Sequence, residues 1–322
     1  MALYLGIDVG GTKTDAVIAD HTGRILGTGR AGPANWEIVS LGGTYLELVQ
    51  ALDQALVSAG VQRSELCAGG YGLAGLDWPA DEPRLREVVE RLGVPGPQVL
   101  VNDGFVALRA GSDDGTGVAI ISGTGSTIAG RNRGGEQFRT FGLGTRWGDF
   151  GAASDIVGLA TRAVVHAYTG RGQPTSLTER LLNAYQVNDV PALAEHVSRG
   201  LATPPDGRQA SLVFAAASEG DLVAREILRS TAEELGVNAA AVARRLGFGD
   251  QPFPLVLAGG VFRANAGLLP DLVLRYVCES AAGAHLERLT CPPVVGGVLL
   301  AFDATGVADT RAVRERLIAE YS

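Results

Sequence analysis

Two glycine-rich segments with the same pattern constrain the fold of this chain more than any other feature. The first, LYLGIDVGGTKTDAVIAD from Leu3, has an apolar strand, then Asp8 and a Gly-Gly-Thr-Lys turn, then a second apolar strand. The second, GVAIISGTGSTIAGR from Gly117, repeats this order around Gly-Thr-Gly-Ser. A single glycine hairpin is an ordinary turn in many folds. Two copies, each near the start of a plausible domain, predict a duplicated architecture that holds one ligand between its halves.

The turn of the first hairpin suits a phosphate group. Glycines permit positive φ and expose backbone N–H groups, which can surround an anion. Asp8, Thr12 and Lys13 would add a carboxylate on the Mg²⁺ side, a hydroxyl donor and a positive charge. Lys13 is also the only lysine in the chain. The segment is not a Walker P-loop, because that motif needs Gly-Lys-Ser/Thr leading into a helix, and here a strand follows.

Length and charge limit the class of protein. A chain of 322 residues is long enough for two ordinary domains with sizeable cores. Hydrophobic residues make up 46% and charged residues 19%, which is typical of globular and not of disordered proteins. The net charge is −8 and no Lys/Arg-rich run occurs, so we do not expect nucleic acid as a partner.

The sequence also gives an expectation about the cellular compartment. No apolar run approaches the roughly 18–20 residues that a membrane span needs, and no signal-peptide pattern is present. Cys67, Cys278 and Cys291 show no C-x-x-C spacing, which argues against a disulfide scaffold or a cysteine-ligated metal. We therefore expect a cytoplasmic protein with no membrane partner.

After the first hairpin, helical and strand patterns alternate. Leu46, Val49, Leu52 and Leu56 fall on one face of a helix predicted over 44–59. The next predicted elements are a strand in LCAGGYGLAGLDWP, a helix over 84–92, a strand over 99–101 and a helix that ends near Gly111. This order is typical of an α/β fold.

After the second hairpin the pattern is mainly helical, with one buried strand predicted over 255–257. Helices are predicted over 152–168, 176–184, 190–200, 208–219, 222–246, 268–278 and 310–321. No low-complexity linker occurs, so we expect the two halves to pack against each other.

Polar or glycine residues at three places are candidates for a site. Asp103 follows a predicted strand, where open α/β sheets collect ligands, and it could accept a proton from a substrate hydroxyl. Asn-Asp-Gly is equally a common turn sequence. Asp149 precedes a helix and could cap it or bind sugar hydroxyls. Gly259-Gly260 would let a flat group such as adenine approach the backbone, or would form a tight turn.

Taken in chain order, the first glycine hairpin, Asp103, the second glycine hairpin and Gly259-Gly260 resemble the corresponding segments of sugar kinases in the actin-like ATPase superfamily. More narrowly, the chain resembles the N-acetylglucosamine kinase branch, grouped with the BadF/BadG/BcrA/BcrD ATPases. The resemblance covers nearly the whole chain and rests on five motifs: GIDVGGTKT, VNDG, ISGTGS, GLGTRWGDFGA and LAGGVF. It implies an α/β fold with two actin-like (ribonuclease H-like) ATPase domains and a cleft between them. We expect the first domain over 1–111 joined by 305–322, and the second over 112–304.

The resemblance implies an ATP-dependent kinase that phosphorylates the 6-hydroxyl of N-acetylglucosamine or a related amino sugar by in-line transfer. Asp8 would help to hold Mg²⁺ through water, and Asp103 would take the proton from the hydroxyl. The residues implied for ATP are Gly10, Gly11, Thr12, Lys13, Gly123, Thr124, Gly125, Ala217, Gly259 and Gly260. Those implied for the sugar are Asn35, Trp36, Asp103, Gly142, Leu143, Gly144 and Asp149. The implied cofactors are ATP and Mg²⁺, and the implied assembly is a homodimer.

Two departures from the family pattern fall beside the expected sugar site. Close N-acetylglucosamine kinases tend to have Gly-Trp-Gly and Gly-Asp-Glu-Gly where this chain has Gly142-Leu143-Gly144 and Gly148-Asp149-Phe150-Gly151. These changes keep glucosamine or another hexose open as the acceptor. A further alternative is an ATPase activator of a 2-hydroxyacyl-CoA dehydratase, whose relatives hold an iron–sulfur cluster through paired cysteines. The absence of cysteine between Cys67 and Cys278 argues against this alternative.

Overall fold

The computed structural model describes residues 2–264, 267–307 and 310–321, and the described part contains two five-stranded sheets. The strands of the first sheet are β1 (Leu3–Val9), β2 (Thr14–Asp20), β3 (Ile25–Ala31), β4 (Leu66–Leu73) and β5 (Gln98–Val101). Their order is β3-β2-β1-β4-β5. The strands β1 to β3 pair antiparallel, whereas β4 pairs parallel with both β1 and β5.

The second sheet repeats this design. Its strands are β6 (Gly117–Ser122), β7 (Ser126–Arg131), β8 (Gln137–Arg139), β9 (Phe253–Ala258) and β10 (Ala284–Arg288). The order β10-β9-β6-β7-β8 is that of the first sheet, with an antiparallel meander followed by two parallel strands. The duplicated architecture predicted from the two hairpins is therefore confirmed.

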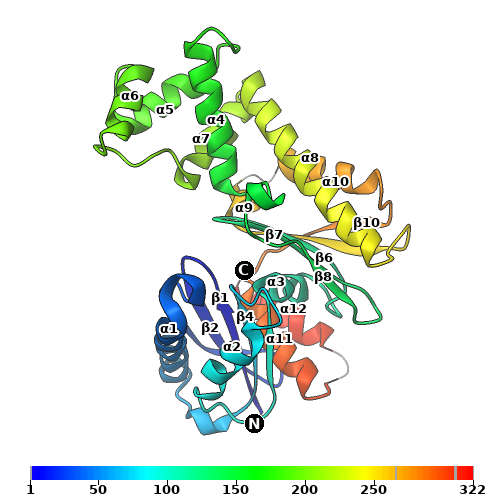
Figure 1. Ribbon diagram of the computed structural model, residues 1–322. Helices are drawn as coiled ribbons and strands as arrows, with labels where there is room; N and C mark the ends of the chain where they lie inside the picture. The colour runs from blue at the N-terminus through cyan, green and yellow to red at the C-terminus, as the bar shows by residue number, and fades with distance from the viewer. Residues whose placement is uncertain (1, 265–266, 308–309, 322) are drawn as a thin grey trace.

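The helices divide unequally between the two halves. The first half contains α1 (Trp36–Ala59), α2 (Asp81–Glu90) and α3 (Asp103–Gly111). The second contains α4 (Ala153–Tyr168), α5 (Leu177–Tyr185), α6 (Val190–Ser198), α7 (Ala210–Ser218), α8 (Leu222–Arg245), α9 (Gly260–Ala264) and α10 (Leu268–Cys278). The chain closes with α11 (Val294–Ala304) and α12 (Arg311–Ala319). Figure 1 shows α4 to α7 gathered at the end of the molecule that lies farthest from the first sheet. None of the described helices is long and apolar enough to span a membrane.

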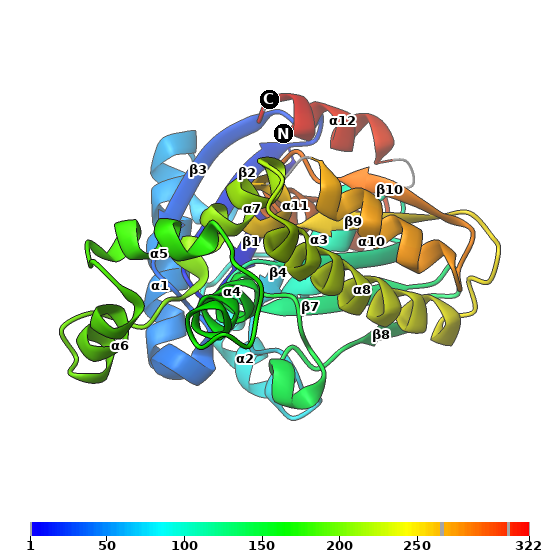
Figure 2. The same ribbon diagram turned by 90° about the horizontal axis from the view of Figure 1, so that it is seen from above.

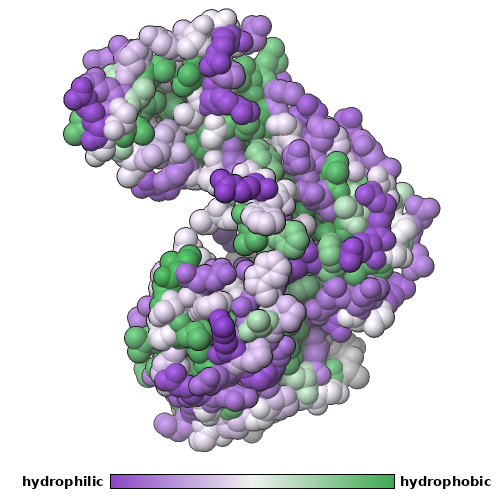
Figure 3. All heavy atoms as spheres, in the orientation of Figure 1, coloured by the Kyte–Doolittle hydropathy of each residue, from purple (hydrophilic) through white to green (hydrophobic). Residues whose placement is uncertain are grey.

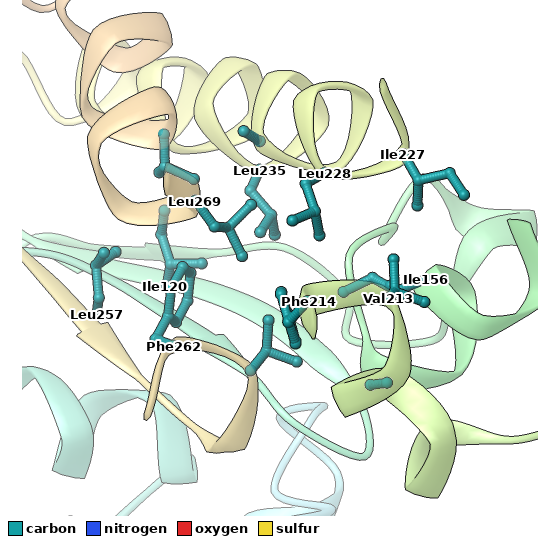
Figure 4. Packing of buried hydrophobic residues seen from close by; sticks show 14 of the residues in the cluster. Ile120, Ile156, Val213, Phe214, Ile227, Leu228, Leu235, Leu257, Phe262 and Leu269 are labelled. Carbon is teal, nitrogen blue, oxygen red and sulfur yellow. The ribbon is translucent and has the colours of Figure 1, made fainter. Parts of the chain in front are cut away.

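The core of the second domain lies between its sheet and the helices that cover it. Figure 4 shows Ile120 of β6 and Leu257 of β9 facing Leu235 of α8, Leu269 of α10 and Phe214 of α7. These five side chains are all buried. Because helices cover the faces of the sheets, the loops at the strand ends are the part of each domain that can form a binding site.

Two helices, α3 and α11, form the layer between the sheets (Figure 1). Helix α3 packs on the second sheet, where Leu108 contacts Ala119 and Val256. Helix α11 packs on the first sheet, where Val298 lies against Tyr4 and Val17. The two helices approach so closely that a Cβ on Gly296 would lie 2.0 Å from the Val106 carbonyl oxygen. One helix of this layer therefore packs on each sheet, and the contact between the two helices joins the domains.

The packing of α11 differs from the sequence-based division of the chain. Residues up to 304 were expected in the second domain, whereas α11 covers the first sheet together with α12. Figure 2 shows α12 near both chain ends, and Arg316 of α12 donates to the Thr22 hydroxyl at 2.8 Å. We therefore propose that the residues from 294 onward belong to the first domain.

One ion pair, between a buried arginine and an aspartate that is 37% exposed, fastens this returning segment to α3. The Arg109 side chain is 2% exposed, and its Nε donates to Asp303 Oδ2 at 2.7 Å. Arg109 also donates to the Ser112 carbonyl oxygen and the Thr310 hydroxyl. These contacts hold α3, α11 and the start of α12 together.

We expect Asp303→Ala to lower the free energy of unfolding by about 3 kcal/mol, because it leaves the Arg109 charge buried without its partner. Denaturant melts measure this loss. Asp113→Ala, which removes exposed pairs with Arg311 and Arg314, should cost less than about 1 kcal/mol. Equal losses in the two variants would contradict the assigned role of the Arg109–Asp303 pair.

Candidate active site

A deep hollow separates the two lobes of the molecule in Figure 3. A backbone hydrogen bond closes the turn of each glycine hairpin. Gly10 N–H donates to the Lys13 carbonyl three residues on, and Gly123 N–H donates to the Gly125 carbonyl two residues on, each at 2.9 Å. A Cβ on Gly11 or Gly125 would meet no atom within 4 Å. Both turns therefore present open backbone, as a phosphate-binding turn requires.

The hydroxyl-bearing residues of these turns, Thr12 and Thr124, are exposed. The ammonium group of Lys13 forms a salt bridge with Asp15 of β2. The Asp15 carboxylate also accepts from Arg30 Nε at 2.6 Å. Sequence analysis missed Asp15, although its place two residues after Lys13 puts both side chains on one face of the strand.

Asp8 lies near the end of β1, directly opposite Asp15 in the strand register. Burial and the neighbouring Asp103 and Asp15 carboxylates raise the pKa of Asp8 to about 8, and Lys13 opposes this rise. Three carboxylates this close repel one another, and a divalent cation would relieve that repulsion. Among the described residues, no group of three or more acidic, histidine or cysteine side chains is placed to hold a metal ion. Asp8 would therefore contribute a single carboxylate to Mg²⁺ beside the phosphate turn.

Asp103 is the first residue of α3 and directly follows Asn102, which caps the helix. The Asn102 Oδ1 accepts from Gly104 N–H at 3.0 Å. Burial and the charge of Asp77 raise the pKa of Asp103 to about 6, while the Gly104 N–H and Arg139 act in the opposite direction. A carboxylate with such a pKa is ionised at neutral pH and is a stronger base than an ordinary aspartate.

The expected sugar loop runs from Gly142 to Gly151 and contains a short 3₁₀ helix at Thr145–Trp147. Asp149 is buried within it, and its Oδ2 accepts from the Leu143 N–H at 2.9 Å. Asp149 does not cap α4, since Asp155 accepts from Gly151 and Ala152 N–H there. Asp149 therefore closes its own loop, and Leu143 and Gly142 are exposed beside it.

The sugar loop is fixed to the second hairpin. Ser122 Oγ donates to the Gly151 carbonyl at 2.5 Å, and Ser126 Oγ donates to the Phe150 carbonyl at 3.2 Å. The first N–H of α4 donates to the Gly123 carbonyl at 2.9 Å. A shift of the phosphate-type turn would therefore move the sugar loop with it.

Asn35 and Trp36 begin α1 on the other domain. Asn35 caps this helix by accepting from Glu37 N–H at 2.9 Å, and Trp36 Nε1 donates to the Gly75 carbonyl at 2.7 Å. The Arg84 guanidinium lies over the Trp36 ring. Both predicted sugar residues thus form hydrogen bonds within the protein, and Trp36 contacts the loop that follows β4.

The three residues expected at adenosine lie in different settings. Gly259 has φ +102, and a Cβ there would lie 2.0 Å from the Ser122 carbonyl oxygen, so a close turn against β6 requires glycine. Gly260 opens α9, and a Cβ on it would meet nothing within 4 Å. Ala217 is buried in α7 and packs in the core of the second domain. Gly260 alone of the three offers open backbone.

The structure adds two charged residues that the sequence analysis did not single out. Asp77 follows β4, Arg139 ends β8, and they pair across the two domains at 2.9 Å. Both affect the pKa of Asp103. No local pattern identifies such a pair, because its members are 62 residues apart. The one sequence signal for Asp77 is that it is a polar residue, in GLDWP, that follows a strand.

Comparisons with known proteins agree with this geometry. The model of the BadF/BadG/BcrA/BcrD ATPase family matches residues 5–301. The chain belongs to this family. An N-acetylmuramic acid/N-acetylglucosamine kinase from Clostridium acetobutylicum is 30% identical over 302 residues, which are 94% of this chain and 98% of the relative. An N-acetyl-D-glucosamine kinase from Dictyostelium discoideum is 29% identical over 323 residues, again with 94% and 98% covered.

Among solved structures, a candidate N-acetylglucosamine kinase from Chromobacterium violaceum has a TM-score of 0.71 and 26% identity, with 93% of this chain and 98% of that chain covered. These similarities confirm the expected fold of two actin-like ATPase domains. They also confirm that this member of the BadF/BadG/BcrA/BcrD ATPase family is an ATP-dependent sugar kinase.

Proposed function

We propose that this kinase transfers the γ-phosphoryl group of ATP to the 6-hydroxyl of N-acetylglucosamine or a related amino sugar. The observation that carries the proposal is the place of Asp103. It starts the helix between the two sheets, near Asp8, with a pKa of about 6. The names of the relatives from Clostridium acetobutylicum and Dictyostelium discoideum support an N-acetylated amino sugar as the acceptor.

In the proposed reaction, Asp103 accepts the proton of the sugar hydroxyl as its oxygen attacks the γ-phosphorus in line with the leaving oxygen. The open turns at Gly10–Lys13 and Gly123–Gly125 bind the phosphates through backbone N–H groups. Asp8 would help to hold Mg²⁺, and the metal would supply charge neutralisation at the phosphates.

The remaining predicted residues orient the two substrates. Asn35, Trp36 and the sugar loop closed by Asp149 face the acceptor, and Gly260 offers its backbone to the adenosine. Because these groups belong to different domains, closing the cleft would bring them together and exclude water, which competes with the sugar hydroxyl.

The test is ATP-dependent phosphorylation of N-acetylglucosamine, N-acetylmannosamine, glucosamine and glucose by the purified protein, followed by mass spectrometry. We expect N-acetylglucosamine to gain one phosphoryl group with the highest kcat/KM. A clear preference for glucose or glucosamine would contradict the acceptor assignment and leave the kinase chemistry in place.

The pKa of Asp103 predicts the acid limb of the pH–rate profile. Only the ionised carboxylate can accept a proton, so kcat/KM for the sugar should fall tenfold per pH unit below about pH 6. Rates measured from about pH 5 to pH 8, with the protein checked for folding at each pH, test this. A rate that stays constant down to pH 5 would contradict Asp103 as the base.

A further inference from the structure

Arg139 connects the stem of the sugar loop to the opposite domain. Its Nη2 donates to the Asp77 carbonyl oxygen at 2.6 Å and lies 2.9 Å from the Asp77 carboxylate. Its Nη1 donates to the carbonyl oxygens of Thr140 and Phe141, both at 2.9 Å. The Arg139 and Asp77 side chains are only 14% and 13% exposed, so water weakens this pair little.

From Asp77 the contacts continue to the catalytic helix. The same carboxylate oxygen, Asp77 Oδ1, accepts from Asn102 Nδ2 at 3.1 Å. Asn102 is 7% exposed and caps α3 through its other side-chain atom, directly before Asp103. The loop itself is held by Asp81, which accepts from the Asp77 and Trp78 N–H groups at 3.1 and 2.7 Å.

A ring contact runs beside the ion pair. Trp78 is the neighbour of Asp77, and its ring centroid lies 5.8 Å from that of Phe141. The Phe141 ring centroid in turn lies 6.2 Å from that of Trp147 in the sugar loop. The loop after β4 and the stem of the sugar loop therefore touch at two adjacent points, one charged and one aromatic.

We propose that Arg139 is a positioning residue that sets the sugar loop and Asp103 in register across the two domains, acting through Asp77 and Asn102. This inference rests on the proposed function, in which Asp103 is the base. Arg139 does not touch the reacting atoms in this role. It fixes the distance between the loop that orients the sugar and the carboxylate that takes its proton.

The geometry of the guanidinium explains why an arginine stands here. Its planar fork serves four acceptors at once, two on the sugar-loop stem and two on Asp77. A lysine ammonium would keep the charge but could not hold this arrangement. Arg139 also balances the negative charge of Asp77, which otherwise acts on Asp103.

The test compares Arg139→Gln, Arg139→Lys, Asp77→Asn and the double variant Asp77→Asn/Arg139→Gln. Arg133→Gln is the matched control, because Arg133 is an exposed arginine in the β7–β8 turn of the same sheet. We expect Arg139→Gln to lower kcat about 10- to 100-fold, as small displacements of a reacting group do. The KM for ATP should stay within about twofold, because the phosphate turns keep their own hydrogen bonds.

Two further readouts separate positioning from general stability. Arg139→Lys should recover part of the lost kcat, and the double variant should be no slower than the slower single variant, since both changes break one connection. The expected loss in kcat should persist at temperatures well below the melting temperature of each variant. If Arg139→Gln does not fold, Asp77→Asn and Arg139→Lys give the same comparison.

The inference is overturned if Arg139→Gln and Asp77→Asn keep kcat within about twofold of the wild type, or if their losses multiply in the double variant. Failure of the proposed function gives a different result, namely that the wild type phosphorylates no sugar or that Asp103→Asn stays active. A wild type that needs Asp103 but tolerates Arg139→Gln would leave the proposed function standing and remove the role of Arg139.

Discussion

Asp103→Asn is expected to lower kcat for sugar phosphorylation by about 10²- to 10⁴-fold, the usual contribution of a general base. Asparagine has the same shape but cannot accept the hydroxyl proton at neutral pH. The KM for ATP should change little, because Asp103 lies on α3 and not on a phosphate turn. Coupled measurement of ADP release together with product mass gives both parameters.

The control for this variant is Asp113→Asn, an exposed carboxylate just past the other end of α3. It should retain the wild-type rate. A kcat for Asp103→Asn within about tenfold of the wild type would contradict the base assignment, since removal of a true general base costs more than this.

Asp8→Asn is the second substitution with a large expected effect. We expect kcat to fall about 100-fold, and the Mg²⁺ concentration for half-maximal rate to rise, because a carboxylate that orients metal-bound water is lost. The Asp8 carboxyl has a pKa of about 8 and loses its proton when it binds the cation, which an asparagine side chain cannot do.

Thermal melts give an independent readout of the same change. Mg²⁺ with ATP should raise the melting temperature of the wild type more than that of Asp8→Asn, because a ligand stabilises in proportion to its affinity for the folded state. Asp20→Asn, at the far end of β2, is the matched control. An unchanged Mg²⁺ requirement in Asp8→Asn would contradict the metal role of Asp8.

Local sequence patterns were sufficient to predict the two glycine hairpins, which repeat one order of strand, turn and strand. Both glycine hairpins appear in the structure, although Ser126, assigned to the second turn, already begins β7, and α10 has its predicted bounds, Leu268–Cys278. These elements depend on apolar periodicity and turn chemistry, which are properties of neighbouring residues. The same is true of the strand before Asp103, although Asn102 and Asp103 form the cap and first residue of α3 and not a turn.

Helix α11 shows what local patterns miss. Its segment contains Pro-Pro followed by Gly-Gly, residues that disfavour helices, and no helix was predicted there. In the structure the two prolines precede or cap the helix, and the glycines let it approach β1, β4 and α3. Packing between both sheets outweighs the poor propensity, and this packing is the basis for the proposed domain boundary at residue 294.

The candidate site shows the same limit. The carboxylates of Asp8, near the end of β1, and Asp103, just after β5, could be found from sequence, whereas the Asp77–Arg139 pair could not. The Asp77–Arg139 pair forms where two distant loops meet, and a single sequence gives no measure of that proximity. Asp149 was expected at the sugar, and its bond to the Leu143 N–H shows a part in loop closure that its sequence position does not indicate.

The most direct test of the proposed reaction is the position of the phosphate in the product. The wild type is incubated with ATP, Mg²⁺ and N-acetylglucosamine, and the product is examined by phosphorus–proton correlation NMR, with the 6-deoxy sugar in parallel. Transfer of the γ-phosphoryl group from ATP to the 6-hydroxyl, with Asp103 as the base, predicts a single phosphate coupled to the C6 protons and no product from the 6-deoxy sugar. A phosphate at another carbon, or ATP consumption with no phosphorylated sugar, would contradict it.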